Sequence, residues 1–264
     1  MRFFPKDTLA LLTDFGDRDW YVAAMKAVAL SIDASLPIVD ICHTINPGDI
    51  RSAAFILSQC WREFPTGTVF VVVVDPGVGT DRPPIALEAD GRFFVGPDNG
   101  LFGWLGNAVI QCHDITNATL FRECVSHTFH GRDIFAPVGA RLAAGLANLD
   151  QVGPAHPQLD PTDWPIPSYE SKSAYGQILY IDHYGNAITN LHERELSPRY
   201  DLAEMVVSLH PRHVVIGRTF GDVPHGQPVA YIGSGGHLEI AVNGGCAKTL
   251  LDLRLDQHIE LLPR

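Results

Sequence analysis

Up to residue 149 the chain alternates between short apolar runs and segments whose apolar residues recur with helical spacing. These patterns predict strands at 8–13, 37–45, 68–74, 85–88 and 92–95, and helices at 19–31, 49–64 and 131–146. The run at 68–74 is apolar at nearly every position, which is typical of a central strand buried on both faces. The alternation of strands and helices predicts an α/β sandwich with a mainly parallel sheet.

The pattern changes after residue 149. A group of prolines between residues 153 and 173 predicts a stiff, extended linker: Pro154, Pro157, Pro161, Pro165 and Pro167. Short apolar runs separated by Gly- and Asn-containing turns then predict a small antiparallel barrel or sandwich, with strands at 176–181, 205–209, 214–216, 228–232, 237–242 and 251–262. We therefore expect an α/β domain at 1–152, a Pro-rich linker at 153–173 and an all-β domain at 174–264.

The composition limits the classes of partner. The 264 residues are 46% hydrophobic, which excludes a disordered chain, and they carry a formal net charge of -11. Such a surface repels nucleic-acid phosphates and anionic membranes, and no basic run offsets it locally. We expect no nucleic-acid or membrane partner, and a small zwitterionic or net-positive substrate fits better than a polyanion.

The expected location in the cell follows from the N-terminus and the cysteines. The first residues, MRFFPKDTLALLTDFGD, contain no long apolar stretch behind a basic start, so we expect no signal peptide. The run TVFVVVV is too short to cross a bilayer. Scattered cysteines without a C-x-x-C pair are typical of reduced thiols, and we therefore expect a cytoplasmic protein.

Four clusters rich in Gly, Asp, Asn or His follow predicted strands, where the loops of α/β sheets bind ligands. The first is TDFGDRDWY at 13–21, in which Asp14 ends the first strand. Its carboxylate can accept hydrogen bonds from the two hydroxyls of a ribose. Capping of a turn is an equally good interpretation.

The second cluster, VDPGVGTDR, places an acid and a guanidinium on either side of two glycines. Asp75 and Arg82 can pair over this tight loop, which would keep Asp75 ionised near neutral pH. The alternative is a solvated surface pair, but the apolar strand before the loop favours a buried one. The loop lacks the GxxxxGK[ST] pattern of a phosphate-binding P-loop.

The third cluster, HTFHGRDIFAP, contains His130 followed by Gly131, which allows an unusual backbone turn. A lone histidine at this position can equally be a core residue. His127 and His130 together are a weak metal signal, because no matching Cys or His pair lies nearby. We therefore predict no metal site and no cofactor.

The fourth cluster lies in the β-rich half, in DHYGNAITN at 182–190 and GSGGHLEIAVNGGCA at 233–247. Its Asp, Ser and Asn side chains and its glycine-exposed backbone can bind the polar groups of a ligand. Both segments also fit hairpin turns, and the residues alone leave the two interpretations open.

Taken together, the clusters resemble those of the S-adenosyl-L-methionine hydroxide adenosyltransferases, adenosine-forming hydrolases related to the fluorinases and chlorinases. The resemblance rests on long collinear motifs between residues 9 and 262: TDFGDRDWYVAAMK, INPGDIRSAAF, VDPGVGTDR, FVGPDNGLF, TFHGRDIFAP, DHYGNAITN and SGGHLEIAVNGGCA. It implies an N-terminal α/β domain and a C-terminal antiparallel β-barrel domain. It also implies a homotrimer, with each active site between the N-terminal domain of one subunit and the C-terminal domain of its neighbour.

The resemblance implies roles for individual residues, matched motif by motif. The residues that handle the attacking water would be Asp75, Arg82 and His130. Those that bind the substrate would be Asp14 for the ribose hydroxyls, Asp182 for the ammonium group, Ser234 near the carboxylate, Tyr184 against the base, and Asn186 with the backbone around Ala247 for the adenine edge.

The expected reaction is hydrolysis of S-adenosyl-L-methionine to adenosine and L-methionine by in-line attack of water on C5′ of the ribose. The sulfonium makes methionine a neutral leaving group, so catalysis consists of positioning the nucleophile and stabilising it electrostatically. Three alternatives stay open: a non-catalytic S-adenosyl-L-methionine sensor, a halogenase of the same family, and a metal-dependent hydrolase using His127, His130 and Asp75. The complete Asp75, Arg82 and His130 set favours hydrolysis over the first two.

Overall fold

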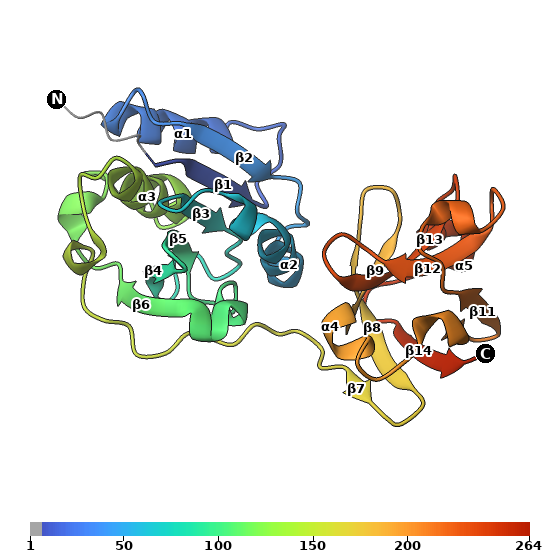
Figure 1. Ribbon diagram of the computed structural model, residues 1–264. Helices are drawn as coiled ribbons and strands as arrows, with labels where there is room; N and C mark the ends of the chain where they lie inside the picture. Colours follow the sequence, from blue (N-terminus) through green and yellow to red (C-terminus); the bar gives the residue numbers. More distant parts are fainter. Residues whose placement is uncertain (1–6) are drawn as a thin grey trace. The chain divides into compact units, whose positions relative to one another are not determined.

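The computed structural model describes residues 7–264, and the chain divides into two compact units, Met1–Asp163 and Trp164–Arg264 (Figure 1). The division falls inside the proline-rich stretch. None of the helices in residues 7–264 is long and apolar enough to span a membrane.

The first unit is built on a six-stranded sheet in the order β2-β1-β3-β5-β4-β6. Its strands are β1 (Leu9–Thr13), β2 (Ile38–Cys42), β3 (Val69–Val73), β4 (Pro84–Ala89), β5 (Arg92–Pro97) and β6 (Val109–Asp114). Strands β2, β1, β3 and β5 are parallel, whereas β4 pairs antiparallel with β5 and with β6. The predicted α/β class with a mainly parallel sheet is confirmed, and β6 is a strand that the apolar pattern did not predict.

Helices cover both faces of this sheet, which explains why its central strands are wholly apolar. One face packs against α1 (Tyr21–Ile32) and α3 (Ala136–Ala143), and the other against α2 (Ile50–Cys60). Successive strand residues point to opposite faces. Leu11 of β1 therefore lies in the first core and Leu12 in the second, and both are buried.

Helix α2 begins where the sequence predicts. The carboxylate of Asp49 accepts a hydrogen bond from the N–H of Ser52 at 2.9 Å, which satisfies one of the free donors of the first turn. The α-helix ends at Cys60 and is followed by a 3₁₀ turn, Trp61–Glu63. The predicted helix at 49–64 therefore spans two kinds of helical turn.

The helix predicted at 131–146 differs from the prediction at both ends. A π-helical turn, Gly131–Phe135, precedes α3, so Pro137 stands in the first turn of α3, where its missing N–H removes no helical bond. Helix α3 ends at Ala143 because Gly145 adopts φ +66°, and the N–H groups that follow close back on carbonyls of the last turn.

The proline-rich stretch bonds to the rest of the chain at both of its ends. In the first unit, the imidazole of His156 bonds to Asp114 at 2.8 Å and to Asp98 at 3.0 Å. Burial alone would lower the pKa of His156, but the two carboxylates outweigh it and raise the pKa. In the second unit, Ser168–Tyr169 form β7, which pairs with β8.

The second unit is an antiparallel sheet in the order β11-β10-β14-β8-β9-β13-β12. Its long strands are β8 (Ala174–Ile181), β9 (Ala187–His192), β10 (Met205–Leu209), β11 (Arg212–Val215), β12 (Pro228–Ile232), β13 (His237–Val242) and β14 (His258–Pro263). A bridge between Ile216 and Ala230 joins the two ends of this order, so the sheet is nearly closed. The predicted antiparallel β-barrel is confirmed.

Two segments of the second unit differ from the prediction. The motif at 182–190 forms the predicted hairpin turn up to Asn186, but its second half is β9, a strand that the pattern did not predict and whose residues alternate between buried and half-buried. Residues 251–262 do not form one strand. Helix α5 (Ala247–Leu251) ends at Asp252, which adopts the left-handed conformation with φ +51°, and β14 begins only at His258.

Candidate active site

The predicted functional loops of the first unit leave the sheet at one edge. Strands β1 and β3 are parallel, and Thr13 pairs with Val73, so Asp14 and Asp75 follow at neighbouring strand ends. Strand β5 lies on the other side of β3 and ends at Pro97. The carboxyl ends of adjacent parallel strands are where α/β proteins bind their ligands.

Asp75, Arg82 and His130, called the trio below, are joined by hydrogen bonds through Arg82. Nε of Arg82 donates to both carboxylate oxygens of Asp75 at 3.0 Å. Nη2 of Arg82 donates to Asp75 Oδ2 and, at 2.8 Å, to Nδ1 of His130. The side chains of Arg82 and Asp75 are only 10% and 4% exposed, so this ion pair is buried rather than solvated.

The contact with Arg82 fixes the tautomer of His130. A guanidinium only donates hydrogen bonds, so Nδ1 of His130 is the acceptor and the ring proton is on Nε2. Burial lowers the pKa of His130, and the positive charge of Arg82 lowers it further. His130 is therefore neutral at neutral pH, with an N–H donor at the ring nitrogen that Arg82 does not contact.

A tight turn returns the chain from Asp75 to Arg82. The N–H and the hydroxyl of Thr80 both donate to the carbonyl of Gly77, at 3.1 and 2.6 Å. The guanidinium of Arg82 then lies over the ring of Phe135, 5.4 Å from its centroid, which adds a cation–π contact. The turn and the ring together direct the guanidinium back toward Asp75.

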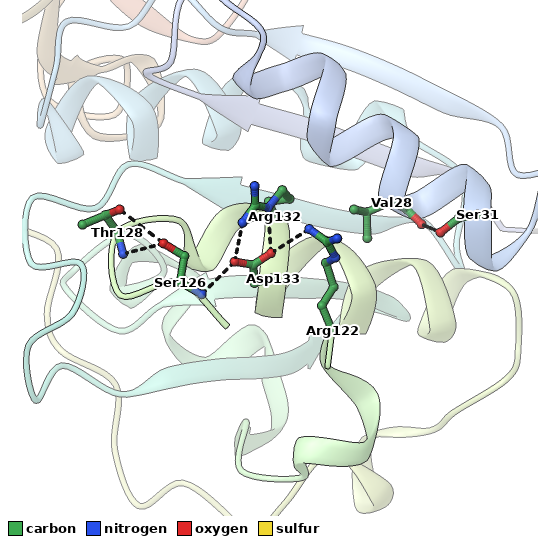
Figure 2. A network of polar contacts seen from close by, with 7 residues as sticks. All are labelled: Val28, Ser31, Arg122, Ser126, Thr128, Arg132 and Asp133. Carbon is green, nitrogen blue, oxygen red and sulfur yellow. Dashed lines mark hydrogen bonds and ion pairs between the residues drawn. The ribbon is translucent and has the colours of Figure 1, made fainter. Parts of the chain in front are cut away.

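A buried ion-pair network holds the loop that presents His130 (Figure 2). The fully buried Asp133 accepts hydrogen bonds from Arg132 at 2.7 Å, from Arg122 at 3.2 Å and from the main-chain N–H of Ser126 at 2.9 Å. Burial alone would raise the pKa of Asp133, but these donors outweigh it and lower the pKa. Asp133 thereby ties both ends of the loop together on either side of His130.

Gly131 does not make the unusual turn that the sequence allows. It belongs to the π-helical turn, and its lack of a side chain leaves room for a neighbouring residue. A Cβ at this position would stand 3.3 Å from the ring of Phe15. The absence of a side chain therefore lets the start of this helix pack closely against the loop that follows β1.

Asp14 lies in the electrostatic range of this trio. Its Oδ2 accepts a hydrogen bond from the N–H of Gly48 at 2.7 Å. Burial raises the pKa of Asp14, the Gly48 N–H partly opposes that effect, and the negative charge of Asp75 raises the pKa further. The two carboxylates are therefore close enough for their charges to repel each other.

A chain of polar contacts that the sequence did not predict anchors the residue before Asp14. The buried hydroxyl of Thr13 bonds to Nδ1 of His43 at 2.8 Å, and Nε2 of His43 bonds to Asp40 at 3.0 Å. Asp40 also accepts a hydrogen bond from Lys26. Because a carboxylate only accepts, Nε2 of His43 carries a proton, and in the neutral ring Nδ1 is then the acceptor to which the hydroxyl of Thr13 donates. A histidine directly after a strand was the only signal available.

The second unit contains an open cavity of about 700 Å³. It is lined by two predicted residues and five others: Tyr184, Asn186, Phe220, Val242, Asn243, Gly244 and Gly245. The rings of Tyr184 and Phe220 are 75% and 39% exposed, so both are accessible to a planar ligand.

Asn186 is oriented by Asp182. The main-chain N–H and the Nδ2 of Asn186 donate to the two carboxylate oxygens of Asp182, at 2.8 and 2.9 Å. Because a carboxylate only accepts, the end of the carboxamide that faces Asp182 is the nitrogen. Oδ1 of Asn186 is therefore the atom that can accept a hydrogen bond from a ligand in the cavity.

A second acid, Glu239, which the sequence did not single out, is affected by the charge of Asp182. Glu239 accepts a hydrogen bond from the hydroxyl of Tyr231 at 3.1 Å. Burial raises the pKa of Glu239, the Tyr231 hydroxyl opposes that effect, and the charge of Asp182 adds to it. Two carboxylates that repel each other in this way favour a cation beside them.

The two remaining predicted residues have different surroundings. Ser234 is exposed in the turn between β12 and β13. Ala247 is fully buried in the core of the barrel at the start of α5, and it does not line the cavity. Residues 243–245 line the cavity instead, where a contact from the backbone around Ala247 was expected.

The histidine pair does not converge on a metal-like site. His127 is exposed, whereas His130 is half-buried. Within residues 7–264, no group of three or more His, Cys, Asp or Glu side chains is arranged to hold a metal ion. The metal-dependent alternative therefore has no geometric observation in its favour.

Comparison with known proteins identifies the family. Residues 9–153 match the SAM hydroxide adenosyltransferase N-terminal domain, and residues 176–260 match the corresponding C-terminal domain. The chain belongs to the SAM hydroxide adenosyltransferase family. The family resemblance seen in the motifs is thereby confirmed.

Relatives of this chain include enzymes and a solved structure. An (R)-S-adenosyl-L-methionine hydrolase from Thermus thermophilus is 39% identical over 261 residues, 95% of this chain and 98% of that protein. The crystal structure of an uncharacterized conserved protein from Thermotoga maritima is 35% identical, with a TM-score of 0.90 over 97% of this chain and 100% of that one. A fluorinase from Nocardia brasiliensis is more distant, at 28% identity over 89% of this chain and 90% of that protein.

This member of the SAM hydroxide adenosyltransferase family therefore carries two chemically distinct sets of residues. The first unit offers an imidazole N–H donor, a carboxylate acceptor and a guanidinium, which together can position a small polar nucleophile. The second unit offers two exposed rings, a carboxamide acceptor and two carboxylates, which suit a nucleoside base and an ammonium group.

Proposed function

We propose that this protein hydrolyses S-adenosyl-L-methionine to adenosine and L-methionine. The observation that carries the proposal is the contact of Asp75, Arg82 and His130 at the carboxyl edge of the sheet. Support also comes from the (R)-S-adenosyl-L-methionine hydrolase of Thermus thermophilus, 39% identical over nearly the whole chain. In this proposal S-adenosyl-L-methionine is the substrate, and the reaction uses no cofactor.

The difficult part of this reaction is supplying a nucleophile. Methionine departs from the sulfonium as a neutral thioether, whereas water, with a pKa of about 15.7, attacks poorly. We assign the positioning of the attacking water to the trio. The Nε2–H of His130 donates to the water oxygen, the carboxylate of Asp75 accepts one of the water hydrogens, and Arg82 holds both side chains in place.

The displacement is in line at C5′ of the ribose. A lone pair of the water oxygen forms the O–C5′ bond while the C5′–S bond breaks, and the electron pair of that bond leaves with methionine. The proton lost by the attacking water passes to Asp75 and then to solvent. The products are adenosine, methionine and one proton, with inversion at C5′.

The nucleoside contacts follow from the donors and acceptors that the residues offer. Asp14 accepts from the ribose hydroxyls. Oδ1 of Asn186 accepts from the 6-amino group of adenine, which a 6-oxo purine lacks. The rings of Tyr184 and Phe220 pack against the base, and the main chain of residues 243–245 contacts its edge.

The amino-acid part of the substrate is assigned to the other polar groups of the second unit. Asp182, with Glu239 beside it, binds the ammonium group, because both side chains are acids. Ser234 binds the carboxylate through its hydroxyl and the N–H groups of its exposed turn.

A product assay in isotopically labelled water tests the function. Incubation of the purified protein with S-adenosyl-L-methionine in H₂¹⁸O should yield adenosine with one heavy oxygen at the 5′ position, detected by mass spectrometry. Bound but unchanged S-adenosyl-L-methionine would identify a sensor instead. Formation of 5′-chloro- or 5′-fluoro-5′-deoxyadenosine in the presence of halide would identify a halogenase.

We further propose that the protein is a cytoplasmic homotrimer in which the trio of one subunit works with the cavity of a neighbouring subunit. The proposal is supported by the presence of water-handling residues in one unit and base-binding residues in the other. Its five cysteines are free thiols, as in proteins of a reducing compartment. Light scattering of the purified protein measures the number of subunits.

Mixed assemblies test whether sites are shared between subunits. Asp75→Asn and Asp182→Ala subunits, each inactive alone, are co-expressed with different tags and purified on both. Each mixed trimer then contains one site with two intact halves, so activity should return to about one third of the wild-type value. A matched pair with both defects in the first unit, Asp75→Asn with Arg82→Lys, should stay inactive. Failure of the first pair to regain activity would contradict shared sites.

A further inference from the structure

Asn99 reaches the main chain immediately before Asp75 from a neighbouring strand. It follows β5, which is parallel to β3, with Val71 paired to Val95. Its Nδ2 donates to the carbonyl of Val74 at 3.0 Å. The carbonyl of Val74 belongs to the peptide group whose nitrogen is that of Asp75, so this bond acts on the backbone that carries the carboxylate.

The orientation of the Asn99 carboxamide is forced by its partner. A carbonyl oxygen only accepts, so the end of Asn99 that faces Val74 is the nitrogen. Oδ1 of Asn99 is then enclosed, with no hydrogen-bond partner among residues 7–264. A buried acceptor left without a partner is destabilising, because it loses its hydrogen bonds to water and gains none in the fold. A contribution to stability therefore does not explain the carboxamide at this position. Its ability to donate a hydrogen bond to Val74 without carrying a charge does explain it.

The turn around Asn99 is held from its other side. The carboxylate of Asp98, only 4% exposed, accepts hydrogen bonds from the main-chain N–H of Asp160 at 3.0 Å and from His156 at 3.0 Å. Gly100, at φ +91°, leaves no room for a Cβ, which would stand 2.8 Å from the carbonyl of Pro161. Asn99 is thus fixed on both flanks and cannot follow Asp75 if that residue shifts.

We propose that Asn99 is a positioning residue for Asp75. It fixes the peptide between Val74 and Asp75 with a donor that carries no charge, so the carboxylate stays in register with Arg82. A carboxylate at position 99 would remove the donor and place a negative charge against the carbonyl of Val74, the residue before Asp75. The inference rests on the proposed hydrolysis, in which Asp75 accepts a hydrogen from the attacking water.

The experiment compares Asn99→Asp with Asn99→Ala in the full-length protein. Both variants should lower kcat about 100-fold with KM within a factor of two, because a small misplacement of a catalytic group is enough. Only Asn99→Asp should move the acid limb of the kcat–pH profile to higher pH, because the new charge disfavours ionisation of Asp75. Asn99→Ser, which keeps a short donor, should retain more activity than Asn99→Ala.

Asn117→Asp is the matched control. Asn117 also donates its Nδ2 to a main-chain carbonyl, that of Gln151 at 2.8 Å, but away from the trio, so its substitution should leave kcat and the pH profile unchanged. If the wild type is active and folded Asn99→Asp has an unchanged kcat–pH profile, the inference about Asn99 is overturned and the hydrolase assignment stands. The same follows if all three variants at position 99 lose only thermal stability. A wild type that forms no adenosine overturns the hydrolase assignment and this inference together.

Discussion

Replacing Asp75 with asparagine should lower kcat about 10³-fold and leave KM for S-adenosyl-L-methionine nearly unchanged. The side chain keeps its size, but it loses the charge that Arg82 neutralises through both carboxylate oxygens. The amide nitrogen of the asparagine would direct its N–H groups either toward Arg82, which itself has only donors, or toward the attacking water. Steady-state kinetics of adenosine formation measure both parameters.

Arg82→Lys should have an effect of the same order for a different reason. One ammonium group cannot donate to both oxygens of Asp75 and also to Nδ1 of His130, whereas the guanidinium does so in one plane. The control is Asp90→Asn, at the exposed pair with Arg62, where the side chains are 48% and 65% exposed. Asp90 adopts φ +49°, which asparagine tolerates, so this variant should behave as wild type. Wild-type kcat in Asp75→Asn would remove the trio from the mechanism.

The sequence predicted most of the fold where apolar residues recur at a regular spacing. The run at 68–74 indicated a strand covered on both faces, and β3 has that environment. The sequence was less informative where two local patterns overlap. Residues 182–190 have the composition of a turn, yet their second half is β9, because pairing with β8 and β13 decides its conformation.

The sequence predicted the candidate site only in part, because residues that are far apart in the chain and close in the fold leave no local pattern. Asp75 and Arg82 are close in sequence, and their pairing could be inferred from the loop. His130 joins them from 48 residues away from Arg82, and the residues alone gave it no partner. Phe220 lines the cavity but lies outside every motif, since an aromatic ring in a loop has no chemical signature until tertiary structure places it.

The stability of the first unit should depend strongly on one carboxylate. Asp133 is fully buried and accepts hydrogen bonds from Arg132, Arg122 and Ser126 (Figure 2). In Asp133→Asn, the amide nitrogen would face one of these donors and the charge that pairs with two guanidinium groups would be lost. We expect the free energy of unfolding to fall by about 3 kcal/mol. Urea unfolding followed by tryptophan fluorescence measures the change, because three of the four tryptophans, Trp20, Trp61 and Trp104, lie in this unit.

The same carboxylate gives a pH dependence with a defined sign. The pKa of Asp133 in the folded protein is lowered from its ordinary value of 3.8. Its contribution to stability is therefore complete above that value and is lost as the pH falls through the lower folded pKa, when the paired carboxylate takes up a proton. Asp133→Asn should remove this part of the acid sensitivity, so wild type and variant should differ most at neutral pH and converge in acid.

The variant Asp163→Asn tests whether burial or ion pairing accounts for the effect expected at Asp133. Asp163 also binds an arginine, Arg51, at 2.8 Å, but it is 94% exposed, so its loss should change the free energy of unfolding by no more than about 0.5 kcal/mol. Because Asp133 closes the loop on either side of His130, its variant should also lower kcat, while Asp163→Asn should not. Equal stability of the two variants at neutral pH would show that the Asp133 network does not hold the loop, and a normal kcat in Asp133→Asn would show that His130 is positioned by Arg82 alone.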